Sequence, residues 1–169
     1  DGAFFRDKEV AVVGGGDAAI EEALFLARLV QKVHIIHRRD QLRAIKILQE
    51  RAFAHENMAF IWDSVVEKIV GDQDVESLLL RNVKNNNTLS LKVEAVFIYV
   101  GLHPNTEWLK GTLPLTDQGF IDTNDRMETT LPGVFAAGDV RNKLLRQVAT
   151  AVGDGSTAAF AAEKFIDSL

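Results

Sequence analysis

The chain has 169 residues, enough for one domain or for one domain and part of another. Its hydrophobic content of 47% is ordinary for a globular protein, and its net charge of −5 argues against partners such as nucleic acid or an anionic membrane. It contains no cysteine, which excludes disulfides, thiolate metal sites and a dithiol redox pair; we expect no metal and a reducing cytoplasm.

The first half of the chain alternates strand and helix patterns. Glu9–Val13 is a short β-branched run that predicts a buried strand, and Asp17–Val30 is a breaker-free stretch that predicts a helix. Val33–His37 predicts a second strand. Asp40 is then expected to cap a helix over Gln41–Ala54. This order predicts a parallel sheet with covering helices.

The middle of the chain reads as an antiparallel meander. Its short strand candidates are Ala59–Trp62, Val65–Val70, Ser77–Asn82 and Thr88–Val93. Asn85-Asn86-Asn87 predicts a hairpin turn, because Asn tolerates positive φ. Ala95–Val100 predicts a fully buried strand that ends at Gly101. Even with Leu102 this apolar run is too short to span a bilayer, and no signal peptide precedes it.

After Gly101 the pattern changes, and we place a domain boundary near residue 102. Phe120–Asp122 and Val134–Ala137 are strand candidates. Arg146–Leu169 predicts one long Ala-rich helix. Gly153 and Gly155 interrupt it at a cost of about 1 kcal/mol each relative to Ala, which suggests either ordinary helix packing or the close approach of a backbone or ligand.

A glycine loop follows the first predicted strand. Gly14-Gly15-Gly16-Asp17-Ala18-Ala19 matches G-x-G-x-x-A in the strand-to-helix context that the motif requires. Gly14 permits a tight turn, Gly16 lets the backbone approach a pyrophosphate, and Ala19 allows close packing of helix on strand. The helix N-terminus adds free N–H groups and positive potential. A simple Gly-rich turn remains the alternative.

A basic cluster follows the second predicted strand. An acid that would bind a ribose 2′-hydroxyl is expected here in NAD-binding proteins, but the chain has His37-Arg38-Arg39, with Arg43 close behind. Arginine forks match phosphate oxygens. Combined with the glycine loop, the cluster predicts binding of NADP(H) in preference to NAD(H). The alternative is a solvated basic patch paired with Asp40.

Three segments, in the same order, resemble the low-molecular-weight thioredoxin reductases: Val10–Leu29 (VAVVGGGDAAIEEALFLARL), His37–Leu48 (HRRDQLRAIKIL) and Leu131–Val140 (LPGVFAAGDV). The resemblance implies an α/β fold, with a Rossmann-like NADPH-binding domain over residues 1–101 and the C-terminal segment of an FAD-binding domain of the same kind over 102–169. It also implies NADPH and FAD as cofactors, thioredoxin as a partner and a homodimeric parent protein.

The same resemblance implies particular site residues. Those of the pyrophosphate loop are Gly15, Gly16, Asp17 and Ala18, and those of the 2′-phosphate site are His37, Arg38, Arg39 and Arg43. The flavin contacts are Gly138, Asp139, Arg146, Gln147 and Val148. Asp1 matches the proton-donating acid of the family. Gly14 and Gly101, each at the end of a predicted strand, are further cofactor-binding candidates.

The chain departs from the family pattern at two places. The Cys-x-x-Cys dithiol and the N-terminal FAD segment are both missing, so we expect a truncated reductase that is inactive alone. Two other interpretations stay open. One is a related flavin reductase without a dithiol, such as a ferredoxin–NADP reductase of similar architecture. The other is a stand-alone NADP-binding module without catalysis.

Overall fold

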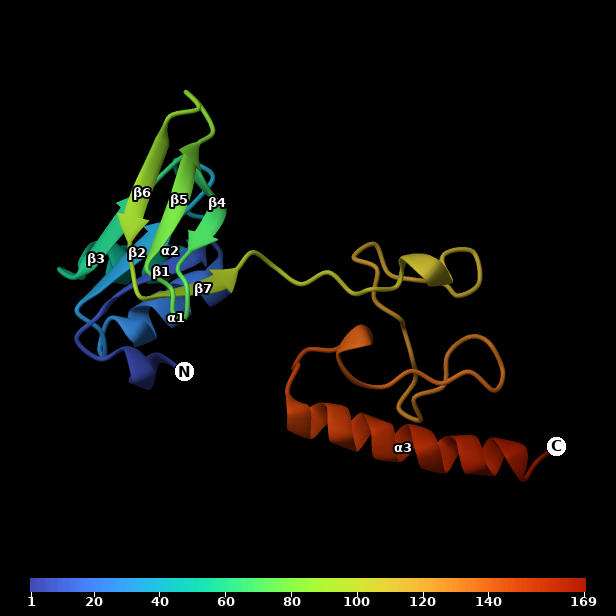
Figure 1. The fold of residues 1–169 in the computed structure, drawn as a ribbon. Coiled ribbons are helices and arrows are strands. Elements are labelled where there is room, and N and C mark those ends of the chain that lie inside the picture. Colours follow the sequence, from blue (N-terminus) through green and yellow to red (C-terminus); the bar gives the residue numbers. More distant parts are fainter. The chain divides into compact units, whose positions relative to one another are not determined.

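A computed structural model describes residues 1–169, which form two compact units, Asp1–Gly101 and Leu102–Leu169. Figure 1 shows the elements of each, and we describe each unit by itself. None of the helices is both long enough and apolar enough to span a membrane.

The first unit is built on a parallel sheet with the strand order β3-β2-β1-β7. The strands are β1 (Glu9–Gly14), β2 (Lys32–Ile36), β3 (Met58–Ile61) and β7 (Ala95–Tyr99). In the centre of the sheet, Val10 lies between Val33 and Ala95. The predicted α/β class is confirmed, because a parallel sheet needs helical crossovers and the chain supplies them.

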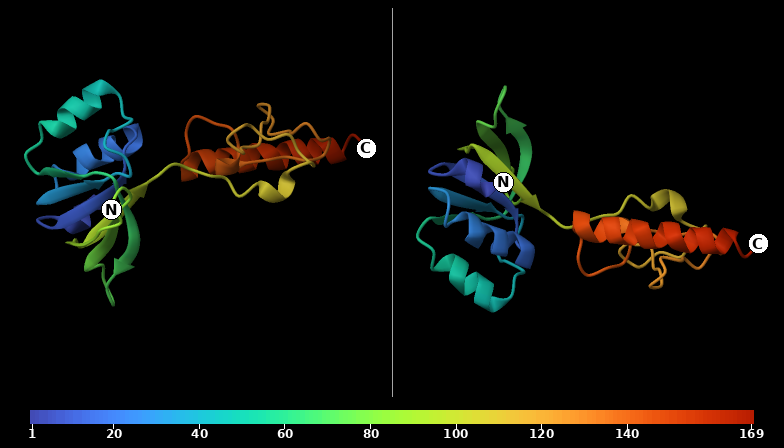
Figure 2. Two further views of the ribbon diagram at one scale, coloured as in Figure 1. Left: turned by 90° about the horizontal axis from the view of Figure 1, so that it is seen from above. Right: turned by 90° about the horizontal axis from the view of Figure 1, so that it is seen from below.

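Helices α1 (Asp17–Leu26) and α2 (Lys46–Phe53) cover one face of this sheet, and Figure 2 shows both on the same side of the strands. Val10, Val12 and Ile35 point toward them and are fully buried. Ile20 of α1 is likewise buried in this core. A 3-10 turn at Gly2–Phe5 adds Phe5, whose ring meets Phe97 of β7 edge-on.

An antiparallel sheet with the order β4-β5-β6 lies on the opposite side (Figure 2). Its strands are β4 (Ser64–Val70), β5 (Ser77–Asn82) and β6 (Thr88–Lys92). Leu78 and Leu80 of β5 are buried together with Ala11 and Ile36 of the parallel sheet. The predicted Asn turn joins β5 and β6, and Asn86 adopts φ 59° there.

Four predictions for this unit are wrong in detail, and the fourth concerns the second helix. The strand expected at Ala59–Trp62 is β3, and it joins the parallel sheet beside β2, because the crossover through α2 returns the chain in the parallel direction. The first helix ends at Leu26, short of Val30. The strand β7 is not fully buried: it is an edge strand, and Ile98 is 59% exposed.

The second helix begins at Lys46, five residues later than predicted, and Asp40 does not cap it. Tertiary hydrogen bonds hold the preceding residues out of the helix. The backbone N–H groups of Arg43 and Ala44 both donate to the Gly15 carbonyl, at 2.6 and 3.1 Å. The N–H of Ile45 donates to the carboxylate of Asp17 at 2.8 Å, so the acid of the glycine loop satisfies a free donor of α2.

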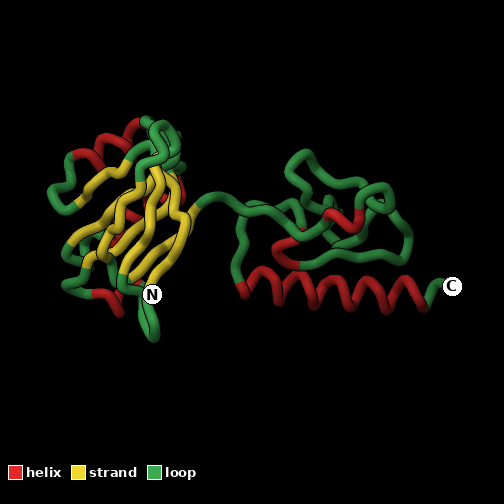
Figure 3. The backbone as a smooth tube through the Cα atoms, turned by 45° about the horizontal axis from the view of Figure 1, so that its top comes forward, coloured by secondary structure: helices red, strands yellow, loops and turns green.

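The second unit consists of loops and one long helix, α3 (Val148–Ile166), as Figure 3 makes plain. Its 3-10 turns lie at Glu107–Leu109 and Gly138–Val140. The strands predicted at Phe120–Asp122 and Val134–Ala137 do not form; only isolated bridges occur there, such as Ile121 with Leu115 and Arg141. The predicted long helix is two residues shorter at its start and three at its end. Gly153 and Gly155 lie within it.

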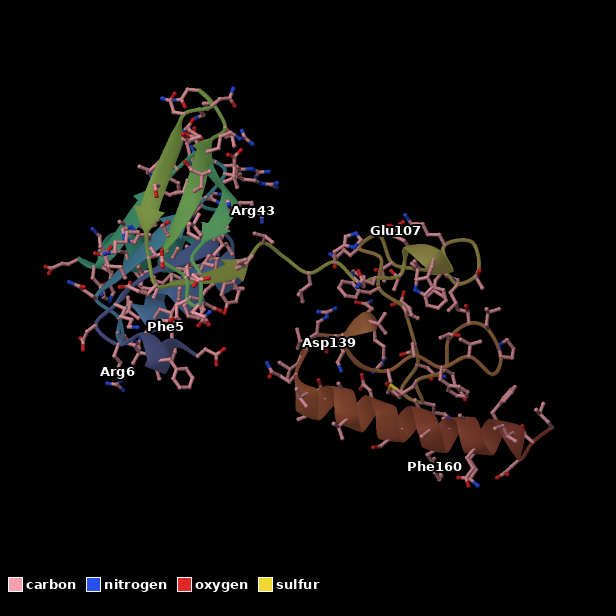
Figure 4. All side chains as sticks on the ribbon, viewed as in Figure 1. Phe5, Arg6, Arg43, Glu107, Asp139 and Phe160 are labelled. Atoms are coloured by element: carbon pink, nitrogen blue, oxygen red, sulfur yellow. The ribbon has the colours of Figure 1, made fainter.

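The buried core of this unit is small. Besides Ala161, the helix α3 buries no residue, whereas Val148, Val152 and Phe160 are exposed by 81%, 64% and 63%. In Figure 4 the Phe160 side chain points from α3 away from the loops of the unit. The core cluster itself is Leu109, Leu113, Ile121 and Ala136.

Candidate functional site

A cleft of about 520 Å³ lies at the carboxyl ends of the parallel strands of the first unit. In open α/β sheets this edge is where ligands bind. Strands β1, β2 and β7 contribute their last residues to it, and β4 of the antiparallel sheet forms another wall. The lining residues include Gly14, Gly15, His37, Arg38 and Arg43, so the structure brings the glycine loop and the basic cluster to one cavity.

The glycine loop has the geometry that its sequence predicts. Gly14 adopts φ +152°, and a Cβ there would lie 2.4 Å from the Tyr99 carbonyl oxygen and 2.7 Å from the Ala19 Cβ. A Cβ on Gly16 would meet nothing within 4 Å, so its backbone is open to a ligand. Asp17 and Ala18 are exposed in the first turn of α1, where free N–H groups can receive an anion.

The arginines of the basic cluster carry no carboxylate partner. Arg38, Arg39 and Arg43 are exposed, and none of them takes part in an ion pair. Arg38 and Arg43 line the cleft, and Figure 4 labels Arg43 beside β4. Their guanidinium groups are therefore free to bind an anion, and arginine forks suit phosphate.

His37 has a different environment from the arginines that follow it. It is 5% exposed, and its ring lies against Gly15, where a Cβ would come within 2.5 Å of it. Its Nε2 is buried without a hydrogen-bond partner. Burial, together with the charges of Arg43 and Arg39, lowers the pKa of His37 below its ordinary value, so the imidazole is neutral at pH 7. The positive charge of the cluster therefore comes from its arginines.

Two residues that the sequence did not reveal complete this edge of the unit. The Nζ of Lys84, in the β5–β6 turn, lies 3.1 Å from the carboxylate of Asp40 and 2.9 Å from that of Asp63. Asp63 follows β3 and adopts φ 51°. Lys84 is 44 positions from Asp40 in the chain, so no local pattern could have indicated the pairing.

The second unit brings its own predicted residues together. Gly138 adopts φ +79° and opens the 3-10 turn that contains Asp139, whose side chain is exposed. Arg146 donates to the Asp139 carbonyl at 3.3 Å, and its guanidinium lies 4.1 Å from the centre of the Phe120 ring. Gln147 caps α3, and Val148 begins it.

Asp154 is the residue of this unit that sequence reasoning missed. Its carboxylate accepts hydrogen bonds from the Gly138 N–H at 3.0 Å and from Lys143 at 2.7 Å, and it pairs with Arg141 at 2.8 Å. The hydrogen bond from Lys143, aided by Arg141 and opposed by burial, lowers the pKa of Asp154 to about 2. The sequence did contain one indication of this role, because Asp154 is an acid between Gly153 and Gly155 in an otherwise Ala-rich helix.

The remaining candidates lie apart from these contacts. Asp1 is exposed, and its carbonyl accepts a hydrogen bond from the N–H of Phe4. Gly101 follows β7 with φ +103°, and a Cβ there would meet nothing within 4 Å.

A parallel sheet with a glycine loop entering a helix N-terminus, and free arginines at the end of the next strand, is the arrangement of a Rossmann-type fold. Residues 3–155 match the family model described as pyridine nucleotide-disulphide oxidoreductase. The chain belongs to this family.

Several relatives are similar over the whole chain. It is 50% identical to a thioredoxin reductase of Listeria monocytogenes, over 100% of this chain and 53% of that protein. It is 45% identical to a 34.2 kDa protein in the rubredoxin operon of Clostridium pasteurianum, over 98% of this chain and 54% of that protein. The chain thus spans about half the length of the curated relatives it matches.

Solved structures agree with the sequence comparison. The crystal structure of thioredoxin reductase from Streptococcus pyogenes is similar with a TM-score of 0.84 and 50% identity, covering 100% of this chain and 56% of that one. The crystal structure of T. acidophilum thioredoxin reductase is similar with a TM-score of 0.69 and 33% identity, covering 99% of this chain and 55% of that one.

Proposed function

We propose that the first unit binds NADPH and that the chain is the pyridine-nucleotide part, with one segment of the flavin part, of a thioredoxin-disulfide reductase. The observation that carries this is the set of unpaired guanidinium groups beside the glycine loop. Arg38 and Arg43 line the same cleft as Gly14 and Gly15. This arrangement supports a dinucleotide whose pyrophosphate lies on the loop and whose 2′-phosphate lies on the arginines.

In this proposal, different residues of the chain bind different parts of the cofactor. The open backbone of Gly16 admits the pyrophosphate, and the N-terminus of α1 stabilises its charge. Arg38, Arg39 and Arg43 hold the 2′-phosphate, while neutral His37 packs on Gly15 and fixes the loop. When bound, NADPH supplies a hydride for FAD, from which electrons pass to a disulfide.

In the second unit, Gly138, Asp139, Arg146, Gln147 and Val148 would form one side of the FAD site. The left-handed backbone at Gly138 and the exposed Asp139 carboxylate fit contacts to ribityl and phosphate groups. Because the family's N-terminal flavin segment and dithiol are not in this chain, we expect purified chain to show no flavin absorbance and no disulfide reduction. A stoichiometric flavin spectrum would contradict this.

For the whole protein we propose a cytoplasmic homodimer whose partner is thioredoxin or a similar redox protein. Within it, Asp1 would be the proton donor and Gly101 would lie near the cofactor. Several of the similar proteins are thioredoxin reductases, which supports a thioredoxin reductase over a ferredoxin–NADP reductase as the whole protein. A non-catalytic NADP-binding module is the remaining candidate, and the same cleft would serve it.

Cofactor titration tests the central proposal. Wild type should bind NADPH more tightly than NADH, and Arg38→Ala should reduce that preference by roughly tenfold to a hundredfold, as expected for loss of one charge-assisted hydrogen bond. Arg28→Ala, an exposed arginine on the turn after α1, is the matched control and should leave the ratio unchanged. Equal affinities of wild type for both cofactors would overturn the proposal.

A further inference from the structure

Asp40 places a negative charge beside the arginine cluster. It directly follows Arg39 in the loop after β2, and it is the one acid among residues 37–43. A carboxylate so close to two guanidinium groups is their natural ion-pair partner. It would also repel a phosphate. In the structure, however, its carboxylate contacts Lys84 and none of the arginines.

Lys84 is fixed in position to make this contact. The N–H of Lys84 donates to the Asn82 side chain at 3.0 Å, which orders the β5–β6 turn (Figure 1). Val83 donates to the Asp63 carbonyl, and Asp63 donates to the Arg39 carbonyl, at 2.6 and 3.2 Å. The turn is therefore tied by its backbone to the arginine loop through Asp63.

The charges around Lys84 agree with this geometry. Its ammonium is shared between Asp40 and Asp63, whose side chains are 65% and 16% exposed. The hydrogen bond from Lys84 lowers the pKa of the Asp40 carboxyl, and those to Asp63 and Asp40 raise the pKa of Lys84. Both groups are thus charged at every pH at which the protein would function, and the contact persists as an ion pair.

We propose that Lys84 is a specificity-determining positioning residue: it holds the Asp40 carboxylate away from Arg38 and Arg39 and so keeps them available for a 2′-phosphate. This inference rests on the proposed function of the cleft. It assigns a part of the cofactor preference to a turn that lies outside the glycine loop and the basic cluster.

The probes for the test are 2′,5′-ADP and 5′-AMP, which differ only in the 2′-phosphate. Their dissociation constants are measured by calorimetry on the full chain for wild type, Lys84→Met, Asp40→Asn and the double variant. The ratio of the two constants isolates recognition of the 2′-phosphate. Lys92→Met removes an exposed lysine of β6 that has no ion-pair partner, and serves as the matched control for net charge.

Lys84→Met should lower the preference for 2′,5′-ADP by about three- to fivefold, the scale of one exposed ion pair. Asp40→Asn should retain the wild-type preference, and the double variant should match Asp40→Asn, because no carboxylate remains to compete. Lys92→Met should behave as wild type. An equal loss in Lys84→Met and in the double variant would overturn the proposal, since Lys84 would then act on the phosphate itself.

Asp63 is the other carboxylate that Lys84 holds, so it needs its own comparison. In the Lys84→Met background, Asp63→Asn should leave the loss in place, because Asp63 is largely buried and anchored by its backbone. Rescue by Asp63→Asn in place of Asp40→Asn would refute the role of Asp40. If wild type itself binds both probes equally, the proposed function of the cleft fails first, and the two failures are distinguishable.

Discussion

The two units differ in how much of their apolar surface they bury for themselves. In Asp1–Gly101, two clusters enclose the parallel sheet from both faces, and Val12, Ile20 and Ile35 are fully buried. In Leu102–Leu169, a 19-residue helix buries only Ala161. A helix with apolar residues around much of its circumference needs cover on several sides. The contrast indicates that the first unit is the more stable of the two.

The largest effect should be seen in hydrogen exchange. Amides of β1 and β2 should exchange only through global unfolding, roughly a thousandfold more slowly than those of α3, because local stability follows buried contacts. Mass spectrometry of a dilute monomer measures both regions at once. Equal protection of both would mean that the second unit is a complete small domain, and the stand-alone binding module would become the better hypothesis.

Core truncation should sharpen the comparison. Ile35→Ala removes a fully buried side chain and should lower the free energy of unfolding of the first unit by about 2–5 kcal/mol. Urea unfolding in a Trp108→Phe background isolates the signal of Trp62, which stacks on Phe60. Phe160→Ala is the exposed counterpart. It should change the free energy of unfolding of the second unit, followed by its helical signal, by less than about 0.5 kcal/mol. A large cost there would show that the α3 surface is already packed.

Two glycines offer opposite responses to the same substitution. Gly14→Ala should cost about 2–4 kcal/mol, because φ is +152° and the new methyl group would meet the Tyr99 carbonyl oxygen.

Gly153→Ala should stabilise α3 by about 1 kcal/mol, since a Cβ there meets nothing within 4 Å. Thermal unfolding followed by circular dichroism measures the gain. If Gly153→Ala destabilised the isolated chain, a close packing partner for that face of α3 would have to exist within it.

The smallest effect concerns pH. The pKa of Asp154 is lowered in the folded state to about 2 from 3.8, so its contribution is complete above pH 3.8 and is lost as the pH falls toward 2. The contribution is of the order of 1 kcal/mol. Asp154→Asn should remove this pH dependence from the unfolding of the second unit. An unchanged acid transition in the variant would assign it to other carboxylates.

Local patterns were sufficient to predict the parallel sheet and the glycine loop. The runs around Val12 and Ile35, and the G-x-G-x-x-A spacing, each lie within a few residues, and the physical requirements they express are local. The Asn86 turn was predictable for the same reason. These elements needed no knowledge of what packs against them.

The features that the sequence did not predict depend on contacts between segments that are distant in the chain. The predicted start of α2 was wrong because residues more than 25 positions upstream accept hydrogen bonds from the backbone before it. The Gly15 carbonyl accepts from the N–H of Arg43, and the Asp17 carboxylate accepts from the N–H of Ile45. The pairing of Asp40 with Lys84 is equally non-local. The strands expected at Phe120–Asp122 and Val134–Ala137 lack a continuous partner, so their apolar patterns produce only bridges.

The burial of His37 has a consequence for how binding would respond to acidity. Because its imidazole is already neutral at pH 7 and arginines do not titrate in this range, the cluster keeps a constant charge from neutral to mildly alkaline pH. A phosphate monoester, with a second pKa of about 6, is largely a dianion over this same range. Neither the cluster nor the phosphate would then exchange a proton on binding, and the protein would act as a fixed electrostatic template for the dianion.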